Sequence, residues 1–251
     1  MPFTFSHPAL IIPLKRLPAK YISMTGLVVG SIVPDFEKFI KLSGGNVYSH
    51  TKLGIFWFDL PLGLALAFIF HLVVRDTLIT NLPLFFRKRL ERYKGFNWTR
   101  HFKENPWTVA LCIIIGSFLH ISLDAFTHRE SSYIYLIPFL LKHVTIGPIM
   151  NVGYVTLMWA VIVDLAFSIF GLLYIFYVFL RLPAEPVKPK ATSSLLKFWA
   201  MVLLITSMIV ALKLLLGGEL RNSWQLIYIG IGAGLMGIFL VSAFWLKGRL
   251  S

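Results

Sequence analysis

The chain of 251 residues carries 24 Lys and Arg against 11 Asp and Glu, a formal net charge of +13, although 57% of its residues are hydrophobic. Charged residues make up only 14% of the chain, whereas about 25% is usual for soluble domains. This composition excludes a disordered chain and a purely soluble globule. It also raises the question of whether the basic residues mark one side of a membrane rather than bind nucleic acid.

The N-terminal region holds two apolar segments that are too short to span a bilayer. The longer uninterrupted run, residues 21–33, would extend about 20 Å as a helix, and three prolines interrupt what precedes it. We therefore expect segments 9–14 and 19–33 to form a re-entrant helical hairpin. The alternative is a sixth span with Lys15, Arg16 and Lys20 in the cytoplasm, which the positive-inside rule favours. The ligand-type residues described below favour the hairpin.

Five later segments are apolar enough to cross the hydrocarbon core, which takes roughly 20 residues. They are residues 54–74, 107–124, 153–182, 195–216 and 224–246. The sequence therefore predicts an all-α, polytopic integral membrane protein with about five transmembrane helices plus the N-terminal hairpin. We divide the chain into a metal-site membrane domain (1–182), a cytoplasmic linker (183–194) and a C-terminal two-helix membrane hairpin (195–251).

Basic residues collect in the connections on one side of these spans. The connection 75–106 holds eight Lys and Arg against three acids. With the linker and the C-terminus, this side has fourteen cations, against six in the opposite loops. The positive-inside rule then places the basic connections and the C-terminus in the cytoplasm. We expect residues 75–106 to contact anionic lipid headgroups and expect no nucleic-acid partner.

Three residues of metal-ligand type recur every four positions at the end of the second span. His120, Asp124 and His128 lie on one face if the helix is continuous. Imidazole nitrogen and carboxylate oxygen are ligands of zinc and related divalent metals. The simpler interpretation is that each of the three is a hydrogen-bonded residue at the membrane interface.

The expected topology brings further groups to the same, non-cytoplasmic face. Asp35 and Glu37 follow the N-terminal hairpin, and His50 precedes the first span. His7 reaches this face only if the N-terminal segment is re-entrant. Asp59, in the first turns of its span, is either a group that orients a ligand histidine or an interfacial residue. Glu37 is a second candidate for such an orienting role.

Four phrases of the sequence carry a family resemblance: MPFTFSHPA, LVVGSIVPDFEKF, YSHTKLGIFWFDLPLG and HISLDAFTH. They resemble a bacterial integral-membrane family of unknown function whose members open with nearly the first phrase, and the resemblance covers roughly residues 1–180. It implies a location in the bacterial cytoplasmic (inner) membrane. More remotely, the order of ligand types is similar to that of inner-membrane metal-dependent hydrolase-like proteins and of zinc-dependent phospholipase C.

The remote resemblance implies a set of metal ligands, with His128 serving a further metal: His7, Asp35, His50, His120 and Asp124. The implied cofactor is one or two divalent ions, with zinc as the first candidate, and Asp124 would bridge two ions. The N-terminal Trp and the later His-xxx-Glu of phospholipase C have no counterpart in this chain.

The function implied is that of a membrane-embedded, metal-dependent hydrolase. It would act on a lipid or another phosphoester at the membrane face, with Asp35 and Asp124 as catalytic carboxylates. The alternative is a non-enzymatic transporter or assembly protein with a structural polar or metal-binding cluster. That alternative draws on Asp164, about 11 residues into its expected span, where a charge is costly and usually paired or functional.

Overall fold

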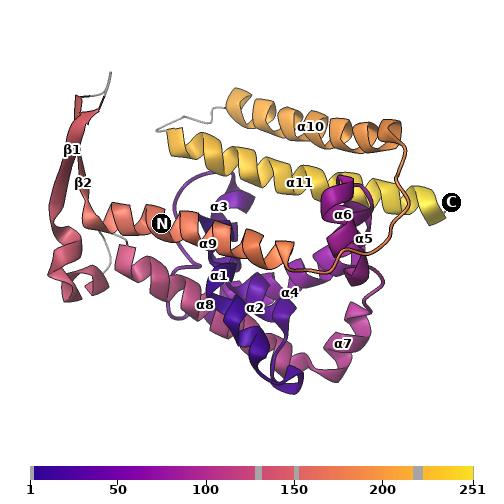
Figure 1. Cartoon of the computed structure of the whole chain (residues 1–251), viewed down its shortest axis with the longest axis horizontal. Helices are drawn as coiled ribbons and strands as arrows, with labels where there is room; N and C mark the ends of the chain where they lie inside the picture. The colour runs from indigo at the N-terminus through magenta and orange to yellow at the C-terminus, as the bar shows by residue number, and fades with distance from the viewer. Residues whose placement is uncertain (1–2, 128–131, 150–152, 217–222, 251) are drawn as a thin grey trace.

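The computed structural model describes residues 3–127, 132–149, 153–216 and 223–250, and this part of the chain is mostly helical (Figure 1). Five of the described helical stretches are long and apolar enough to cross a membrane. They are Ile55–Thr80, Pro106–Phe126, Trp159–Leu180, Thr192–Leu215 and Gln225–Lys247. The prediction of a helical, multi-pass membrane protein with five spans is confirmed.

The N-terminal region consists of short helical pieces. They are η1 (Thr4–Ser6), α1 (Pro8–Ile11), η2 (Ile12–Arg16), η3 (Ala19–Tyr21) and α2 (Met24–Gly30). The longest, α2, has seven residues and reaches only about 10 Å, so none of the helices between residues 3 and 33 can span a bilayer. The side chain of Ser23 caps α2 by accepting a hydrogen bond from the N–H of Gly26. The segment doubles back as a helical hairpin, in agreement with the first of the two alternatives.

Helix α2 packs directly on α8 (Pro106–Thr127), with glycines where the two backbones meet. A Cβ atom on Gly30 would lie 2.2 Å from the carbonyl oxygen of Ile113. A Cβ atom on Gly116 would lie 2.6 Å from the carbonyl oxygen of Leu27. Small residues at such a crossing permit the close approach that drives helix association in membranes. The short hairpin is therefore anchored by a long helix.

After α2 come η4 (Val33–Asp35), α3 (Phe36–Lys41) and a loop that leads to the first span. That span is continuous but irregular, because two of its turns are π-helical. It comprises η5 (Ile55–Asp59), α4 (Leu60–Ile69), η6 (Phe70–Val74) and α5 (Arg75–Thr80), with η5 and η6 as the π-helical turns. Turns of this kind occur often at functional sites.

The basic connection contains three short helices: α6 (Leu84–Leu90), η7 (Glu91–Tyr93) and α7 (Trp98–Glu104). Figure 1 shows α7 at one end of α8 and a β-hairpin beyond the other end. Between α8 and that hairpin lie η8 (Ser132–Leu136) and η9 (Pro138–Leu141). The basic connection and the C-terminal end of α8 are thus separated by the length of α8.

The β-hairpin was not expected from the sequence. Strands β1 (His143–Ile149) and β2 (Gly153–Met158) pair antiparallel, with Thr145 opposite Thr156. β-Branched residues are frequent along both strands, which favours this conformation over a helix. The third span therefore begins as α9 (Trp159–Leu180) rather than at Gly153.

The later start of α9 changes the position of Asp164. This residue lies five positions after Trp159, about 8 Å along the helix, and not about 11 residues into it as the expected span implied. It lies close to the N-terminal region, because Ser168, one turn further on, accepts a hydrogen bond from the backbone N–H of Phe3.

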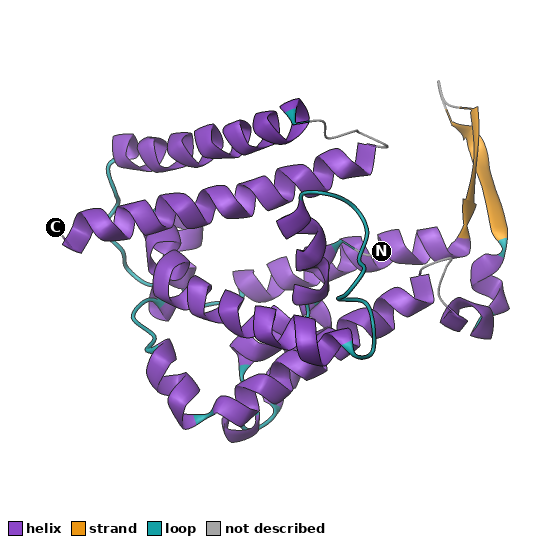
Figure 2. Ribbon diagram, turned by 180° about the vertical axis from the view of Figure 1, so that it is seen from behind, coloured by secondary structure: helices purple, strands orange, loops and turns teal. Residues whose placement is uncertain are grey.

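The last two helices, α10 (Thr192–Leu215) and α11 (Ser223–Leu250), lie side by side in both views (Figures 1 and 2). Helix α11 also packs on α3, where a Cβ atom on Gly232 would lie 2.3 Å from the carbonyl oxygen of Phe39. The C-terminal helix pair therefore contacts the segment that carries Asp35. The division of the chain into the three parts given above stays a prediction.

Candidate metal centre

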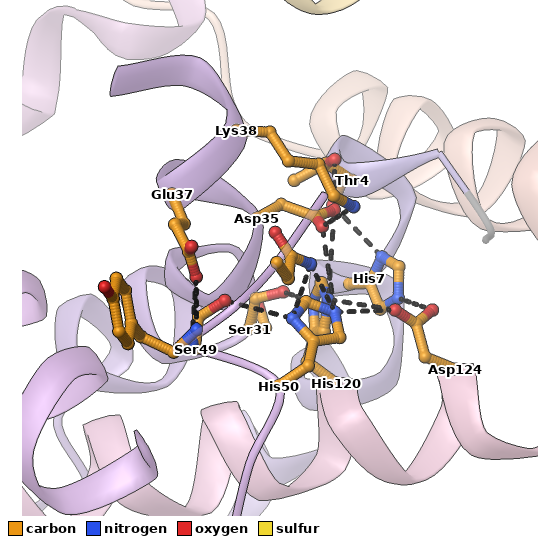
Figure 3. A network of polar contacts seen from close by, with 12 residues as sticks. Thr4, His7, Ser31, Asp35, Glu37, Lys38, Ser49, His50, His120 and Asp124 are labelled. Carbon is orange, nitrogen blue, oxygen red and sulfur yellow. Dashed lines mark hydrogen bonds and ion pairs between the residues drawn. The ribbon is translucent and has the colours of Figure 1, made fainter. Parts of the chain in front are cut away.

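Four side chains of metal-ligand type converge beside the α2–α8 contact. Asp35, His50, His120 and Asp124 each offer a ligand atom, and these atoms lie within 4.8 Å of one another (Figure 3). His7 joins them: its ring stacks on that of His120 with centroids 3.9 Å apart, and its Nε2 lies 3.4 Å from Asp124 Oδ1. All are buried except His50, which is half-buried. The structure thus brings together five of the six residues expected to ligate metal.

Two of the histidines are held in the same way. His120 donates from Nδ1 to the carbonyl oxygen of Ser31 at 2.8 Å, and His7 donates from Nδ1 to the carbonyl oxygen of Thr4 at 3.2 Å. In both rings Nε2 is left facing Asp124, at 3.4 Å. Neither Nε2 has a hydrogen-bond partner among the described residues. An Nδ1–H bonded to a backbone carbonyl, with Nε2 directed inward, is the arrangement found in metal-ligating histidines.

His50 reaches the group from the loop before the first span. Its Nε2 lies 3.1 Å from Asp124 Oδ2, and its Nδ1 lies 2.6 Å from Asn46 Nδ2 and 3.1 Å from Ser49 Oγ. The Oδ1 atom of Asn46 has no hydrogen-bond partner among the described residues. Rotating this amide by half a turn would let Oδ1 accept from Nδ1–H and free the Nε2 lone pair. Burial lowers the pKa of His50, against the opposing effect of Asp124, and this favours the neutral imidazole that binds metal.

Asp35 enters the group from η4. Its Oδ1 accepts a hydrogen bond from Lys38 Nζ at 2.7 Å, and its Oδ2 accepts one from the hydroxyl of Thr4 at 2.5 Å. Burial alone would raise the pKa of Asp35, but with no metal bound the positive charges of His120 and Lys38 outweigh burial and hold the pKa below its usual value. Asp35 is therefore an ionised carboxylate, the form that binds metal.

Glu37 has a different task, because its carboxylate holds the loop that carries His50. It accepts hydrogen bonds from the backbone N–H groups of residues 47–49 at 2.8 to 3.0 Å and from Lys41 Nζ at 2.8 Å. Burial would raise the pKa of Glu37, but Lys41 and the three backbone donors lower it from 4.5 to about 2. Its stabilising effect is therefore complete above pH 4.5 and is lost as the pH falls towards 2.

We expect Glu37→Gln to weaken metal binding without removing a ligand. The amide group of Gln would face N–H donors that now point at a carboxylate oxygen, so the loop would lose contacts and His50 would be less well fixed. Loss of a partner that orients a ligand typically weakens metal binding about 10- to 100-fold. The measurement is a zinc titration of the detergent-purified protein. Glu91→Gln, at a carboxylate of the basic connection paired with Lys94, is the control. Equal affinity of the two variants would contradict the role given to Glu37.

Of the other predicted residues, Asp59 is not among those whose ligand atoms converge. Asp59 is buried at the end of η5, and neither of its carboxylate oxygens has a hydrogen-bond partner among the described residues. At His120, the carbonyl of Ser31 already accepts the hydrogen bond from Nδ1. A role for Asp59 stays a prediction. His128 lies outside the described residues.

Several residues that shape the site were not predicted from the sequence: Thr4, Ser31, Lys38, Asn46 and Tyr228. The spacing of Lys38, one helical turn after Asp35, is a signal that would have indicated their pairing. Ser31 acts through its backbone carbonyl, which no sequence pattern reveals.

A family model described as a domain of unknown function (DUF4184) matches residues 1–243. No curated protein and no solved structure gives a match to the chain. The match reaches beyond the first 180 residues, on which the resemblance was based, and includes most of α11. The expected likeness to a family of unknown function is thereby confirmed, and the remote likeness to metal-dependent hydrolase-like proteins stays a prediction.

Proposed function

Since the chain belongs to the DUF4184 family, whose function is unknown, we propose its function from the buried group itself: a metal-dependent hydrolase of the bacterial cytoplasmic membrane. The site would lie at the non-cytoplasmic face, with the C-terminus and the basic connection in the cytoplasm. The observation that carries the proposal is that three imidazole Nε2 atoms face the carboxylate of Asp124.

The donor set fits a divalent metal, and zinc best. Neutral imidazoles and ionised carboxylates are its usual ligands together with Cys, and the only Cys of the chain, Cys112, is not part of the group. The residues that would hold it are His7, Asp35, His50, His120 and Asp124. A bound metal supplies Lewis acidity and lowers the pKa of a water molecule. Asp35 and Asp124 are the candidate proton acceptors, since both are carboxylates at the group.

The location of the group favours a substrate at the membrane surface. Asp124 lies within one turn of the end of α8, and the partly exposed ring of His50 lies on the loop side of the group. An ester at the level of the lipid headgroups would reach such a site. We therefore propose a phosphoester, free or part of a lipid, as substrate, and anionic lipids as contacts of the basic connection 75–106.

A transporter is the weaker alternative. It relied on a charge at mid-membrane, but Asp164 lies about 8 Å from the start of α9. The polar residues described above gather near one end of the spans and not along a path across them.

Metal removal and restoration test the proposal. We expect the detergent-purified protein to contain about one or two zinc ions per chain and to hydrolyse a phospholipid in nanodiscs. Stripping by a chelator should abolish hydrolysis, and added zinc should restore it. Metal content is read by plasma mass spectrometry and hydrolysis by lipid mass spectrometry. A folded protein that takes up no divalent metal would refute the whole proposal, whereas a zinc-loaded but inactive protein would refute the hydrolase.

A further inference from the structure

One buried cation lies beside the candidate ligands. Lys38 extends from α3 and is only 4% exposed. Its Nζ lies 2.7 Å from Asp35 Oδ1 and 5.6 Å from the centre of the Tyr228 ring on α11. Figure 3 shows it reaching Asp35 from the side opposite to His50 and His120. An ammonium group that is removed from water is costly unless negative charge remains close to it.

The neighbouring lysine of α3 shows what an ordinary ion pair looks like here. Lys41 is at the surface, with a side chain 36% exposed, and pairs with Glu37, a carboxylate used to hold a loop. Lys38 instead pairs with Asp35, a carboxylate that would ligate the metal. A metal on Asp35 would compete with Lys38 for the charge of this carboxylate and would lie close to the Lys38 ammonium.

The charges of the group then call for an anion. Counting only the described side chains of the group, two carboxylates, one ammonium and one divalent ion leave one positive charge when the imidazoles are neutral, and a second metal ion would leave three. Glu37 does not alter this balance, because Lys41 neutralises it. An ionised Asp59 in η5 would only bring the group with one metal to neutrality. A buried positive group of this kind favours a phosphoryl anion over a neutral ester or a peptide.

Tyr228 explains how Lys38 is kept in place. Its ring faces the ammonium at cation–π distance and lies against the loop after α3, where a Cβ atom on Gly44 would be 3.5 Å from Tyr228 Cε2. Helix α11, near the C-terminus, thus places an aromatic ring beside the candidate metal ligands, which all come from the first half of the chain.

We propose that Lys38 is the anion-binding residue of this centre and that Tyr228 positions it. With metal on Asp35, the Lys38 ammonium donates to a phosphoryl oxygen of the substrate, which is a phosphoric ester carried either by a lipid headgroup or by a soluble molecule. This inference rests on the proposed metal-dependent function, and it narrows the substrate class to phosphate anions.

The test is the binding of inorganic phosphate to zinc-loaded protein, measured by calorimetry in detergent. Lys38→Met should retain zinc but bind phosphate about 10- to 100-fold more weakly, since a charge-assisted hydrogen bond is lost. Lys38→Arg should recover most of the affinity because it keeps the charge. Tyr228→Leu should lower the affinity for phosphate by about 2- to 5-fold. Lys52→Met, at an exposed lysine before the first span, is the matched control and should bind as the wild type does.

The outcomes separate this inference from the proposed function. If the wild type takes up no zinc, the proposed function fails and this inference with it. If the wild type binds zinc and phosphate, and Lys38→Met binds phosphate equally well, only the anion role of Lys38 is overturned. Loss of zinc from Lys38→Met would also overturn that role, because Lys38 would then serve to hold Asp35.

A second arm distinguishes the two sources of the phosphoryl group. Micelles of a short-chain phosphatidylglycerol are added to the phosphate complex. Displacement of phosphate from the wild type, with a weaker effect in Lys38→Met, supports a lipid headgroup. Lys38-dependent phosphate binding that the micelles do not displace supports a soluble phosphoester.

Discussion

Asp124→Ala protein is expected to bind zinc at least about 100-fold more weakly than the wild type, because Asp124 is the residue that all three histidines face. Its carboxylate oxygens lie 3.4 Å from Nε2 of His7, 3.1 Å from Nε2 of His50 and 3.4 Å from Nε2 of His120. Without it, a metal would lose a ligand and also the negative charge between the three rings. Affinity is measured by competition with a zinc-binding dye, on protein that elutes as the wild type does in gel filtration.

His143→Ala is the matched control for this variant. His143 is an exposed histidine in β1, outside the candidate centre. Its removal tests whether the loss of any ligand-type side chain, wherever it lies, weakens zinc binding. We expect its zinc affinity to be unchanged. Zinc affinity of Asp124→Ala equal to that of His143→Ala would show that the buried group is not a metal site.

Gly30→Ala is expected to lower the melting temperature by about 5–10 °C, an effect of overpacking at the α2–α8 contact. The added methyl group would lie 2.2 Å from the carbonyl oxygen of Ile113, which is backbone and cannot rotate away. Helix α2 must then move off α8. Ser31, the next residue, supplies the carbonyl that orients His120, so zinc affinity should fall as well. Tryptophan fluorescence during heating in detergent gives the melting temperature.

Gly234→Ala in α11 separates this contact from a general effect of glycine replacement. A Cβ atom there would meet nothing within 4 Å, and alanine favours a helix more than glycine does. We expect its melting temperature to equal or exceed that of the wild type. A melting temperature of Gly30→Ala that equals or exceeds that of the wild type would contradict the close packing of α2 on α8.

The spans were predictable because an uninterrupted apolar run of about 20 residues has to satisfy its backbone hydrogen bonds within itself in a bilayer, and a helix does this. The site was predictable for a related reason. Once the spans and their direction are known, Asp35, His50 and the end of α8 must lie at one membrane face. The placement of His7 depended on the choice between a hairpin and a sixth span. The positive-inside rule favoured the span, whereas the ligand-type residues expected at one face favoured the hairpin.

Other features depend on contacts that the sequence does not display. The sequence analysis places the β-hairpin in a loop and in the start of a span, because the mostly apolar residues of β2 continue directly into α9. The contact between Lys38 and Tyr228 joins positions far apart in the chain and exists only because α11 packs on α3. Glu37 was predicted to orient a ligand, but its action through loop backbone N–H groups could not be foreseen.

The contact between α2 and α8 also sets an order of events during synthesis of the chain. His7, Asp35 and His50 leave the ribosome before α8, yet the hairpin between the first two packs on α8, where Gly116 allows the close contact. The N-terminal segment must therefore wait, without its partner helix, until α8 has been made and inserted. The buried group can therefore assemble only at a late stage of biogenesis, and in a chain truncated before α8 His7 would lack His120 and Asp124, the two α8 residues that it contacts.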